Sequence, residues 1–448
     1  MFQKVLIANR GEIAVRIIQA CRDLGIISVA VYSEADREAL HAQIADEAVC
    51  IGPARAAESY LNMDNIISAA LASGCQAIHP GFGFLSENPD FAERTTQAGL
   101  AFIGPTAATI RLMGDKSEAK RNAIAAGVPV ALGTDGPLRD FDEAISEAER
   151  IGYPVMLKAA SGGGGKGIRV AESVKDLKDA YDNASAEAIA NFGDGRLYME
   201  KYIHNPRHIE VQILGDNYGN VVHLFERECS VQRRHQKLIE ESPSAFVTPE
   251  LREKMTSAAV ALAKRVGYRN AGTIEFLVDN DRNFYFCEMN TRIQVEHPVT
   301  EEVTGVDLVC EQLRVAAGEP LSFKQEDLTI RGHAIECRIN AEDPSRNFAP
   351  CPGTLVSLHL PGGPGVRVDS AAYQGYKIPP FYDSMIGKLI VYGSDRTQAI
   401  DRMRRALAET LFEGVVTGTD YQMHILCSKA FVDANFNVNS IANGDFDQ

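Results

Sequence analysis

The sequence predicts a multidomain protein of α/β and α+β class, in which an N-terminal parallel sheet is followed by mainly antiparallel sheet. Over the first hundred residues, apolar runs alternate with helical patterns, which is typical of a parallel sheet with helices on its faces. From about residue 204 strand patterns return, and the region from about 330 is rich in proline and glycine. That last region predicts short antiparallel strands before helices near 396–412 and 418–431.

Length and composition limit the class of protein. A chain of 448 residues suggests about three domains, which we place at 1–114, 115–330 and 331–448. The longest apolar runs are far shorter than the ~20 residues of a membrane span, and the start shows no secretory cleavage pattern. Nine cysteines without a Cys-x-x-Cys pair predict buried or idle thiols in a reducing cytosol, and hence a cytoplasmic protein.

The net charge of −15 argues against nucleic acid or an anionic membrane as the main partner, because both are bound through a positive field. An anionic substrate therefore needs a local cationic cluster. One such cluster comprises Arg233, Arg234, His235 and Lys237.

The N-terminal region contains the predicted parallel strands KVLIA, SVAVYS, AVCIG, QAIHPG and AFIGP, with a helix from Ile13 to Leu24. Its first turn, Ala8 to Glu12, contains one glycine. A dinucleotide-binding fingerprint needs three glycines there. The pattern therefore disfavours NAD as a ligand.

The next segment contains a helix ending near Gly127, a strand from Val155 to Lys158, the run SGGGGKG at 161–167, a long polar helix and the strand RLYMEKYI. Four consecutive glycines are costly inside regular structure, so this run must be a loop. A flexible linker is one interpretation. A loop that covers phosphates is favoured, because the run follows a strand ending in Lys158 and carries Lys166. It is not a Walker A loop, because Gly167 follows that lysine.

Farther on, strands HIEVQILGD and VVHLFERECSVQRR flank a turn at 217–220, and Thr248-Pro249-Glu250 has the composition of a helix start. Two extended runs at 273–279 and 284–290 then flank a turn at 280–283. Closing that turn symmetrically about 281–282 places Glu275 directly opposite Glu288.

Facing glutamates have a chemical consequence. Facing side chains lie about 5 Å apart at Cβ, and like charges there are destabilising. Leu277 and Phe286, as expected neighbours on the same face, would weaken the screening. Either one glutamate takes a proton or a cation sits between them. With Asn290 nearby, the oxygen donors suit Mg²⁺ or Mn²⁺, and Mg²⁺ typically shares its ligands with substrate phosphates. An exposed pair on a solvated sheet face is the alternative.

Polar residues recur at every second position after Glu288. These residues are Asn290, Arg292, Gln294 and Glu296. In an extended chain their side chains would line one face. His297-Pro298 is expected to end the strand. A guanidinium binds a carbonate-like anion through two parallel bonds, and a neighbouring glutamate can remove a proton from it.

These motifs occur in an order that resembles biotin carboxylase, the ATP-grasp component of acetyl-CoA carboxylase and related biotin-dependent carboxylases. The resemblance runs essentially end to end through IANRGEIA, HPGFGFLSEN at 79, MGDK at 113, KAASGGGGKG at 158, RHIEVQ at 207, ERECSVQRRHQK at 226, EMNTRIQVEHPVTE at 288 and GHAIECRINAEDP at 332. It implies an ATP-grasp enzyme with a Rossmann-like N-terminal domain. It also implies a mobile glycine-rich lid at about 130–203 and a mainly antiparallel C-terminal domain.

The resemblance also implies roles for individual residues. ATP would contact Lys116, Lys158, Gly164, Gly165, Glu200, Lys201, Ile203, His208, Gln232, His235, Leu277, Glu275 and Glu288. Two Mg²⁺ or Mn²⁺ ions would bind Glu275, Glu288 and Asn290. Bicarbonate would contact Lys237, Arg292, Gln294 and the backbone of Val295, with Glu296 as its base. Biotin would contact Arg338 and Phe82. The family usually has tyrosine at the position of Phe82, and asparagine is expected at that of Gly418.

The implied reaction has two stages. Glu296 deprotonates bicarbonate, which is held by Lys237 and Arg292 and attacks the γ-phosphate of MgATP to give carboxyphosphate and ADP. Carboxyphosphate then collapses to CO₂ and phosphate, the phosphate can take the biotin proton, and Arg338 stabilises the charge that develops on the ureido oxygen. No Ala-Met-Lys-Met motif occurs in the sequence, so we expect biotin on a separate biotin carboxyl carrier protein. We also expect separate carboxyltransferase subunits and a homodimer.

Three alternatives stay open at this point. The final acceptor is expected to be acetyl-CoA, as in fatty acid synthesis, with propionyl-CoA or pyruvate as alternatives. An ATP-grasp ligase with a different acceptor is a second alternative. A nucleotide-binding protein without catalytic activity, with a regulatory or scaffolding role, is a third, although the acidic and basic residues of the expected site are all present.

Overall fold

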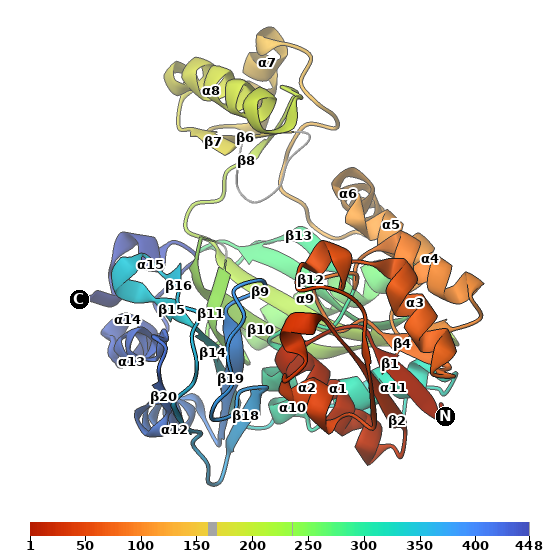
Figure 1. Cartoon of the computed structure of the whole chain (residues 1–448). Coiled ribbons are helices and arrows are strands. Elements are labelled where there is room, and N and C mark those ends of the chain that lie inside the picture. Colours follow the sequence, from red (N-terminus) through yellow and green to blue (C-terminus); the bar gives the residue numbers. More distant parts are fainter. Residues whose placement is uncertain (160–167, 235, 448) are drawn as a thin grey trace.

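The computed structural model describes residues 1–159, 168–234 and 236–447 (Figure 1). The predicted N-terminal parallel sheet is confirmed, with strand order β3-β2-β1-β4-β5. The strands are β1 (Lys4–Ile7), β2 (Ile27–Tyr32), β3 (Glu47–Cys50), β4 (Ala77–His79) and β5 (Ala101–Phe102); the helices are α1 (Gly11–Asp23), α2 (Leu40–Ile44), α3 (Met63–Ala72), α4 (Pro89–Gln97) and α5 (Ala107–Gly114). Both faces are buried, because Val5 and Ile7 pack into one apolar cluster and Leu6 into another.

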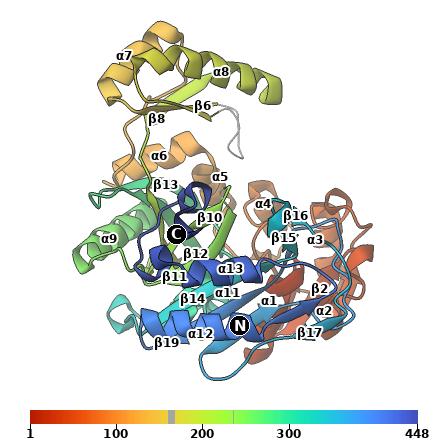
Figure 2. The ribbon, with the colours of Figure 1, turned by 90° about the vertical axis from the view of Figure 1, so that its left-hand side faces the viewer.

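A smaller lobe stands apart from the rest of the molecule in two perpendicular views (Figures 1 and 2). It contains an antiparallel sheet of order β7-β6-β8 and two helices, with a hydrophobic cluster of its own. Its elements are α7 (Phe141–Ile151), β6 (Val155–Ala159), β7 (Ile168–Ala171), α8 (Val174–Phe192) and β8 (Leu197–Lys201), and α6 (Lys116–Ala125) precedes it. The glycine-rich loop, with Gly164 and Gly165, lies outside the described residues.

The main body is built on an eight-stranded antiparallel sheet of order β13-β12-β9-β10-β11-β14-β19-β18. The strands are β9 (Arg207–Gly215), β10 (Val221–Arg233), β11 (Gln236–Ser242), β12 (Asn270–Val278), β13 (Phe284–Asn290), β14 (His333–Asn340), β18 (Val366–Ser370) and β19 (Met385–Gly393). The expectation of only short strands after 330 is wrong for β14 and β19, which have 8 and 9 residues. They extend this sheet because β14 pairs with the free edge of β11 and buries Ile335, Cys337 and Ile339.

Helices and short strand pairs complete the main body. The helices are α9 (Pro249–Arg265), α10 (His297–Thr304), α11 (Leu308–Ala316), α12 (Arg396–Glu409), α13 (Thr419–Cys427), α14 (Lys429–Val432) and α15 (Ser440–Asn443); the pairs are β15 (Glu342–Asp343) with β16 (Ala349–Pro350) and β17 (Ser357–His359) with β20 (Leu411–Glu413). Thr248 caps α9 as predicted, since its Oγ1 accepts from the N–H of Leu251 at 3.3 Å.

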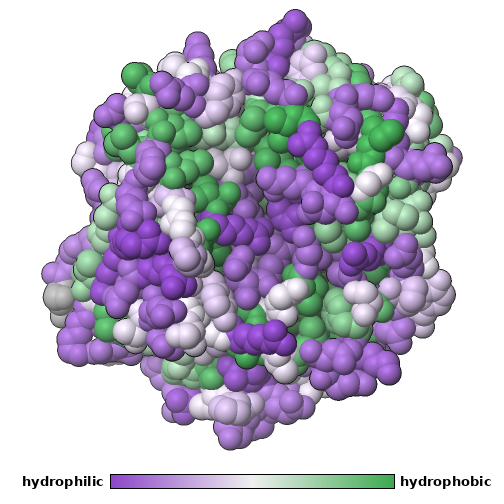
Figure 3. Space-filling model, turned by 90° about the horizontal axis from the view of Figure 1, so that it is seen from below, coloured by the Kyte–Doolittle hydropathy of each residue, from purple (hydrophilic) through white to green (hydrophobic). Residues whose placement is uncertain are grey.

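Two surface properties agree with the composition. The described part of the chain contains no helix of the length and apolarity that crossing a bilayer requires. Seen from below, the surface is mostly polar and carries separated apolar areas (Figure 3).

Candidate active site

The hairpin of β12 and β13 places Glu275 directly opposite Glu288, as predicted. The predicted register of the turn is nevertheless wrong by one residue, because Phe276 pairs with Phe286 and Leu277 with Tyr285. Cys287 is the extra residue of a β-bulge that restores the pairing at the two glutamates. Phe286 therefore packs with Phe276 in the core and is not a neighbour of the acidic pair.

The segment after the hairpin is not the extended strand that the alternation predicted. β13 ends at Asn290, and Glu296 is the residue before the first turn of α10, which contains Pro298. Proline is favoured at a helix start, so His297-Pro298 begins a helix instead of ending a strand. Gln294 still reaches Glu275, with Nε2 donating to Oε1 at 2.8 Å.

Arg292 and Asn290 lie at the edge of this site. Arg292 donates from Nε to Glu87 Oε2 at 2.9 Å and from Nη2 to Asn290 Oδ1 at 2.8 Å. Asn290 Nδ2 donates to Glu275 Oε1 at 2.8 Å. Arg292 is thus tied to the hairpin and to Glu87, a residue that the sequence patterns did not single out.

Lys237 is the cationic centre of the site. Its Nζ lies 2.7 Å from Glu210 Oε2, 3.1 Å from Glu275 Oε1 and 2.6 Å from Glu296 Oε1. Arg338 Nη2 lies 3.0 Å from the second oxygen of Glu296. Glu296 is therefore held by two cations that come from β11 and β14.

Electrostatics separate the two glutamates of the hairpin. Burial alone would raise the pKa of Glu275, but Lys237 and His208 outweigh it and hold that pKa well below its usual range. The pKa of Glu288 is raised, mainly because surrounding protein atoms desolvate the carboxyl group and secondly because of the negative charge of Glu275. One carboxylate is firmly ionised and the other resists ionisation, which is the situation that a bound divalent cation relieves.

A further set of ligand atoms lies on the same face. His208, Glu210 and Glu275 each offer one ligand atom, all within 4.8 Å of one another. Glu210 was not among the predicted site residues, although its alternation with His208 and Gln212 along β9 was a visible signal. The donor set fits a hard divalent cation shared with phosphate oxygens.

Arg227 on β10 connects Glu210 with Gln294. It was also not among the predicted site residues. Its fully buried guanidinium donates to Glu210 Oε1 at 2.6 Å and to Gln294 Oε1 at 3.0 Å. Its other bonds go to Gln212, Thr300 and Thr273. Because each of its three nitrogens donates to a partner, Arg227 fixes the position of both Glu210 and Gln294.

We predict that Arg227→Met lowers the free energy of unfolding by about 3–5 kcal/mol, because it leaves the buried charge of Glu210 without this partner. Equilibrium unfolding in urea measures the change. Arg121→Met is the control, since Arg121 forms an exposed pair on α6 that contributes at most about 1 kcal/mol. Equal effects of the two substitutions would contradict the role assigned to Arg227.

Four predicted nucleotide-binding residues, Lys116, Lys158, Glu200 and Lys201, lie on the small lobe or on α6, which precedes it. Lys158 Nζ on β6 is 2.6 Å from Glu200 Oε2 on β8, and Lys120 is 3.3 Å from the same carboxylate. Lys116 is the exposed first residue of α6. Lys201 Nζ donates to the carbonyls of Gly152 and Tyr153, which holds its amine away from Lys158 and Lys120.

Four other predicted residues lie on strands of the large sheet, just after β8 or in the N-terminal core. Gln232 pairs with Lys237 across β10 and β11, and Leu277 lies two residues from Glu275 on the same strand face. Ile203 follows β8. Phe82 packs against the core of the N-terminal sheet, and its carbonyl accepts from Asn9 at 2.8 Å. His235 lies outside the described residues.

The fold and the arrangement of acids and lysines between sheet and lobe define an ATP-grasp enzyme. Family models agree along the chain: the N-terminal domain of biotin carboxylase matches residues 1–110, the ATP-binding domain of the carbamoyl-phosphate synthase L chain matches 115–324, and the C-terminal domain of biotin carboxylase matches 336–443. The chain belongs to the biotin carboxylase family, whose members are ATP-dependent ligases.

Individual relatives cover almost the whole chain. Biotin carboxylase 1 of Bacillus subtilis is 56% identical over 99% of both chains, and a pyruvate carboxylase subunit of Methanothermobacter thermautotrophicus is 56% identical over 96% of this chain and 88% of its own. Solved structures resemble the chain as well. The Campylobacter jejuni biotin carboxylase complex with β-γ-ATP has a TM-score of 0.94 at 50% identity, covering 99% of both chains.

Another similar solved structure is the biotin carboxylase domain dimer of Hydrogenobacter thermophilus 2-oxoglutarate carboxylase, in complex with MgADP, ADP and bicarbonate. It has a TM-score of 0.93 at 52% identity, and the match covers 100% of this chain and 99% of that one.

Proposed function

We propose that this protein carboxylates biotin on a separate carrier protein, using ATP and bicarbonate and passing through carboxyphosphate. The observation that carries the proposal is the position of Glu296 between Lys237 and Arg338, at 2.6 Å and 3.0 Å. A base held ionised by two cations is suited to an acidic anion, because the same cations attract the anion and stabilise its deprotonated form.

Bicarbonate would bind beside Glu296, with Lys237, Arg292, Gln294 and the backbone of Val295 as its contacts. Burial raises the pKa of Glu296, but Lys237 and Arg338 outweigh burial and keep that pKa well below its usual range. Glu296 is therefore ionised at neutral pH and ready to accept the bicarbonate proton. The deprotonated anion is the nucleophile toward the terminal phosphate.

The nucleotide would lie between the small lobe and the hairpin of β12 and β13. Glu275, Glu288 and Asn290 would hold Mg²⁺, which neutralises charge on the phosphates. Lys116 and Lys158 would bind phosphate oxygens. Because Lys158 is paired with Glu200, we infer that it exchanges this carboxylate for phosphate when nucleotide enters. The other proposed nucleotide contacts are Glu200, Lys201, Ile203, His208, Gln232, His235, Leu277, Gly164 and Gly165.

Biotin would meet Arg338 after carboxyphosphate has released CO₂. Phosphate can take the proton from the ureido nitrogen, and the guanidinium of Arg338 stabilises the negative charge that develops on the ureido oxygen. Phe82 offers a ring face without the hydroxyl that the family usually has at this position.

The same proposal extends to partners and context. We propose a cytoplasmic homodimer that works with a biotin carboxyl carrier protein and carboxyltransferase subunits. We place acetyl-CoA first as the final acceptor, with propionyl-CoA and pyruvate as alternatives. Support for more than one acceptor comes from the relatives, which include a 2-oxoglutarate carboxylase domain and part of a pyruvate carboxylase.

The test is ADP release measured with and without bicarbonate and free biotin. We expect release to require bicarbonate, because the bicarbonate anion is the phosphoryl acceptor, and to increase when biotin is added. Release that is indifferent to bicarbonate would instead support an ATP-grasp ligase with another acceptor. No release under any condition would support a protein that only binds nucleotide.

A further inference from the structure

Two buried glutamates lie behind the proposed biotin site. Glu240 on β11 and Glu336 on β14 are direct partners in the antiparallel sheet, and both side chains are 0% exposed. Facing side chains at such positions lie about 5 Å apart at Cβ. Their carboxyl groups are therefore neighbours in an interior from which water is excluded.

Arg338 connects this pair to Glu296. Its Nε donates to Glu240 Oε1 at 2.6 Å and its Nη2 to Glu296 Oε2 at 3.0 Å. Within the described residues, the second oxygen of Glu240 and both oxygens of Glu336 have no hydrogen-bond partner. An ionised carboxylate buried with unpaired oxygens is costly, so two facing ones cannot both be ionised.

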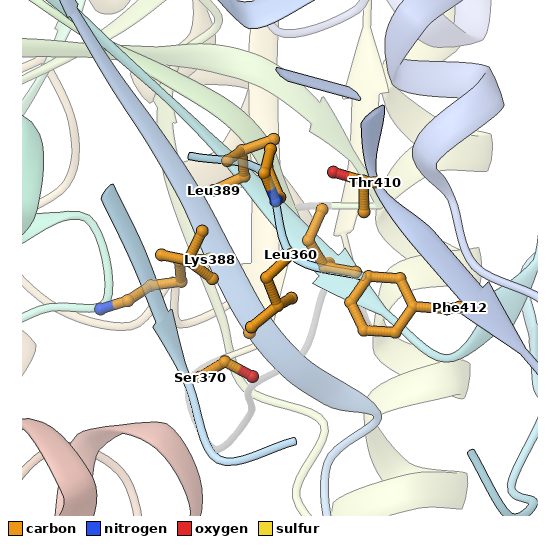
Figure 4. Close-up of a pocket in the computed structure, with 10 residues that line it drawn as sticks. Leu360, Ser370, Lys388, Leu389, Thr410 and Phe412 are labelled. Atoms are coloured by element: carbon orange, nitrogen blue, oxygen red, sulfur yellow. The ribbon is translucent and has the colours of Figure 1, made fainter. Parts of the chain in front are cut away.

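The surrounding cations do not remove this cost. Lys388 on β19 is fully buried, and its Nζ donates to the carbonyl of Val295 at 2.9 Å and lies 3.3 Å from Glu12 Oε2. In a close-up of a small pocket beside β19, the amine of Lys388 points away from Leu360 and Phe412 (Figure 4). Lys388 is thus engaged with Val295 and Glu12.

The charges that face the pair come from several strands. Arg338, Glu296 and Lys237 act on Glu240, and Lys388, Arg338 and Glu296 act on Glu336. Burial raises the pKa of Glu240 to about 7 and that of Glu336 well above its usual range, and the cations only partly oppose this. Both directions agree with a pair that retains a proton at neutral pH.

We propose that Glu240 and Glu336 hold one proton between them, and that Glu240 is the positioning residue that aims Arg338 at the ureido oxygen of biotin. The inference rests on the proposed role of Arg338. With one proton shared by Glu240 and Glu336, Arg338 faces two negative charges, one on this pair and one on Glu296, instead of three. Its positive charge therefore remains able to stabilise the negative charge that develops on biotin. The peptide of Val295 is fixed separately by Lys388.

The test compares Glu240→Gln with Glu336→Gln, which are matched because both are isosteric and buried. Glutamine resembles a protonated glutamate, so we expect Glu336→Gln to keep both the bicarbonate-dependent ADP release and its stimulation by free biotin within about threefold of the wild type. Glu240→Gln should lose about 10- to 100-fold of kcat in the biotin-stimulated reaction, as misplaced groups do. Its biotin-independent ADP release should fall much less, since Lys237 still holds Glu296 at 2.6 Å when Arg338 shifts.

A direct readout of the proton accompanies the kinetics. The infrared difference spectrum of wild type minus Glu336→Gln at neutral pH should contain the carbonyl stretch of one protonated carboxyl, because Glu240 ionises beside Arg338 once its partner is neutral. Absence of that band would overturn the shared proton. Biotin-stimulated kcat that is unchanged in Glu240→Gln would overturn the positioning role.

The outcomes also separate this inference from the proposed function. A wild type without bicarbonate- and biotin-dependent ADP release fails the proposed function, whereas normal wild-type activity with an unaffected Glu240→Gln fails only this inference. If Glu240→Gln does not fold, Glu240→Asp decides, because it keeps the charge and withdraws the carboxylate by one methylene. Full biotin stimulation in Glu240→Asp would then overturn the positioning role, and a loss would support it.

Discussion

Glu288→Gln is expected to reduce bicarbonate-dependent ADP release by about 100-fold or more, the scale on which removal of one electrostatic contribution to a transition state acts. Glu288 faces Glu275 across the hairpin, and the two carboxylates would share the metal that carries the phosphate charge. Glutamine keeps the shape of the side chain and removes the charge. Steady-state ADP release at saturating ATP and Mg²⁺ measures the loss.

The same substitution should not weaken the fold. Removing one of two facing like charges relieves repulsion, so the metal-free variant should be up to about 1 kcal/mol more stable than the wild type. Glu326→Gln, at an exposed position, serves as the matched control and should leave both quantities unchanged. Lower stability together with lower activity in Glu288→Gln would point to a structural role and contradict a metal ligand.

Local sequence patterns predicted the pairing of Glu275 with Glu288 correctly, but they did not predict the conformation of the segment after Asn290. A turn flanked by two extended runs was sufficient to pair Glu275 with Glu288, although the bulge at Cys287 was needed to produce that register. The alternation after Asn290 favoured a strand on periodicity alone. The helix that Pro298 starts overrode it, because the segment folds back to bring Gln294 to Glu275 and Glu296 to Lys237.

Contacts between distant segments were beyond local reasoning. Arg227 on β10 touches residues of β9, β12 and the segment before α10, and no spacing in the sequence indicates that these elements cross. The joining of β14 to β11 is of the same kind. Single alternating strands show which residues share a face, but the order of strands decides which faces meet.

Glu296→Gln should abolish most of the reaction at its first step, with bicarbonate-dependent ADP release falling by about 100- to 10,000-fold, the range attributed to general acid–base catalysis. Glu296 is the carboxylate that Lys237 and Arg338 hold together, so it is well placed to take the bicarbonate proton. Glu302→Gln, on the half-buried side of the same helix, is the control and should retain activity. The variants are compared by ADP release over a series of bicarbonate concentrations.

The pH dependence and the variant Glu296→Asp together distinguish two roles of Glu296, that of a general base and that of a counterion for Lys237. Because the pKa of Glu296 is held well below its usual range by those cations despite burial, the carboxylate stays ionised as pH falls, and any stability it contributes is lost only when pH drops through that lowered value. The wild type should therefore show no acid limb from Glu296 between about pH 6 and pH 8. Glu296→Asp keeps the charge beside Lys237 but withdraws the base, so it should remain folded and lose most of kcat. An aspartate variant with full kcat would show that Glu296 serves only as a counterion.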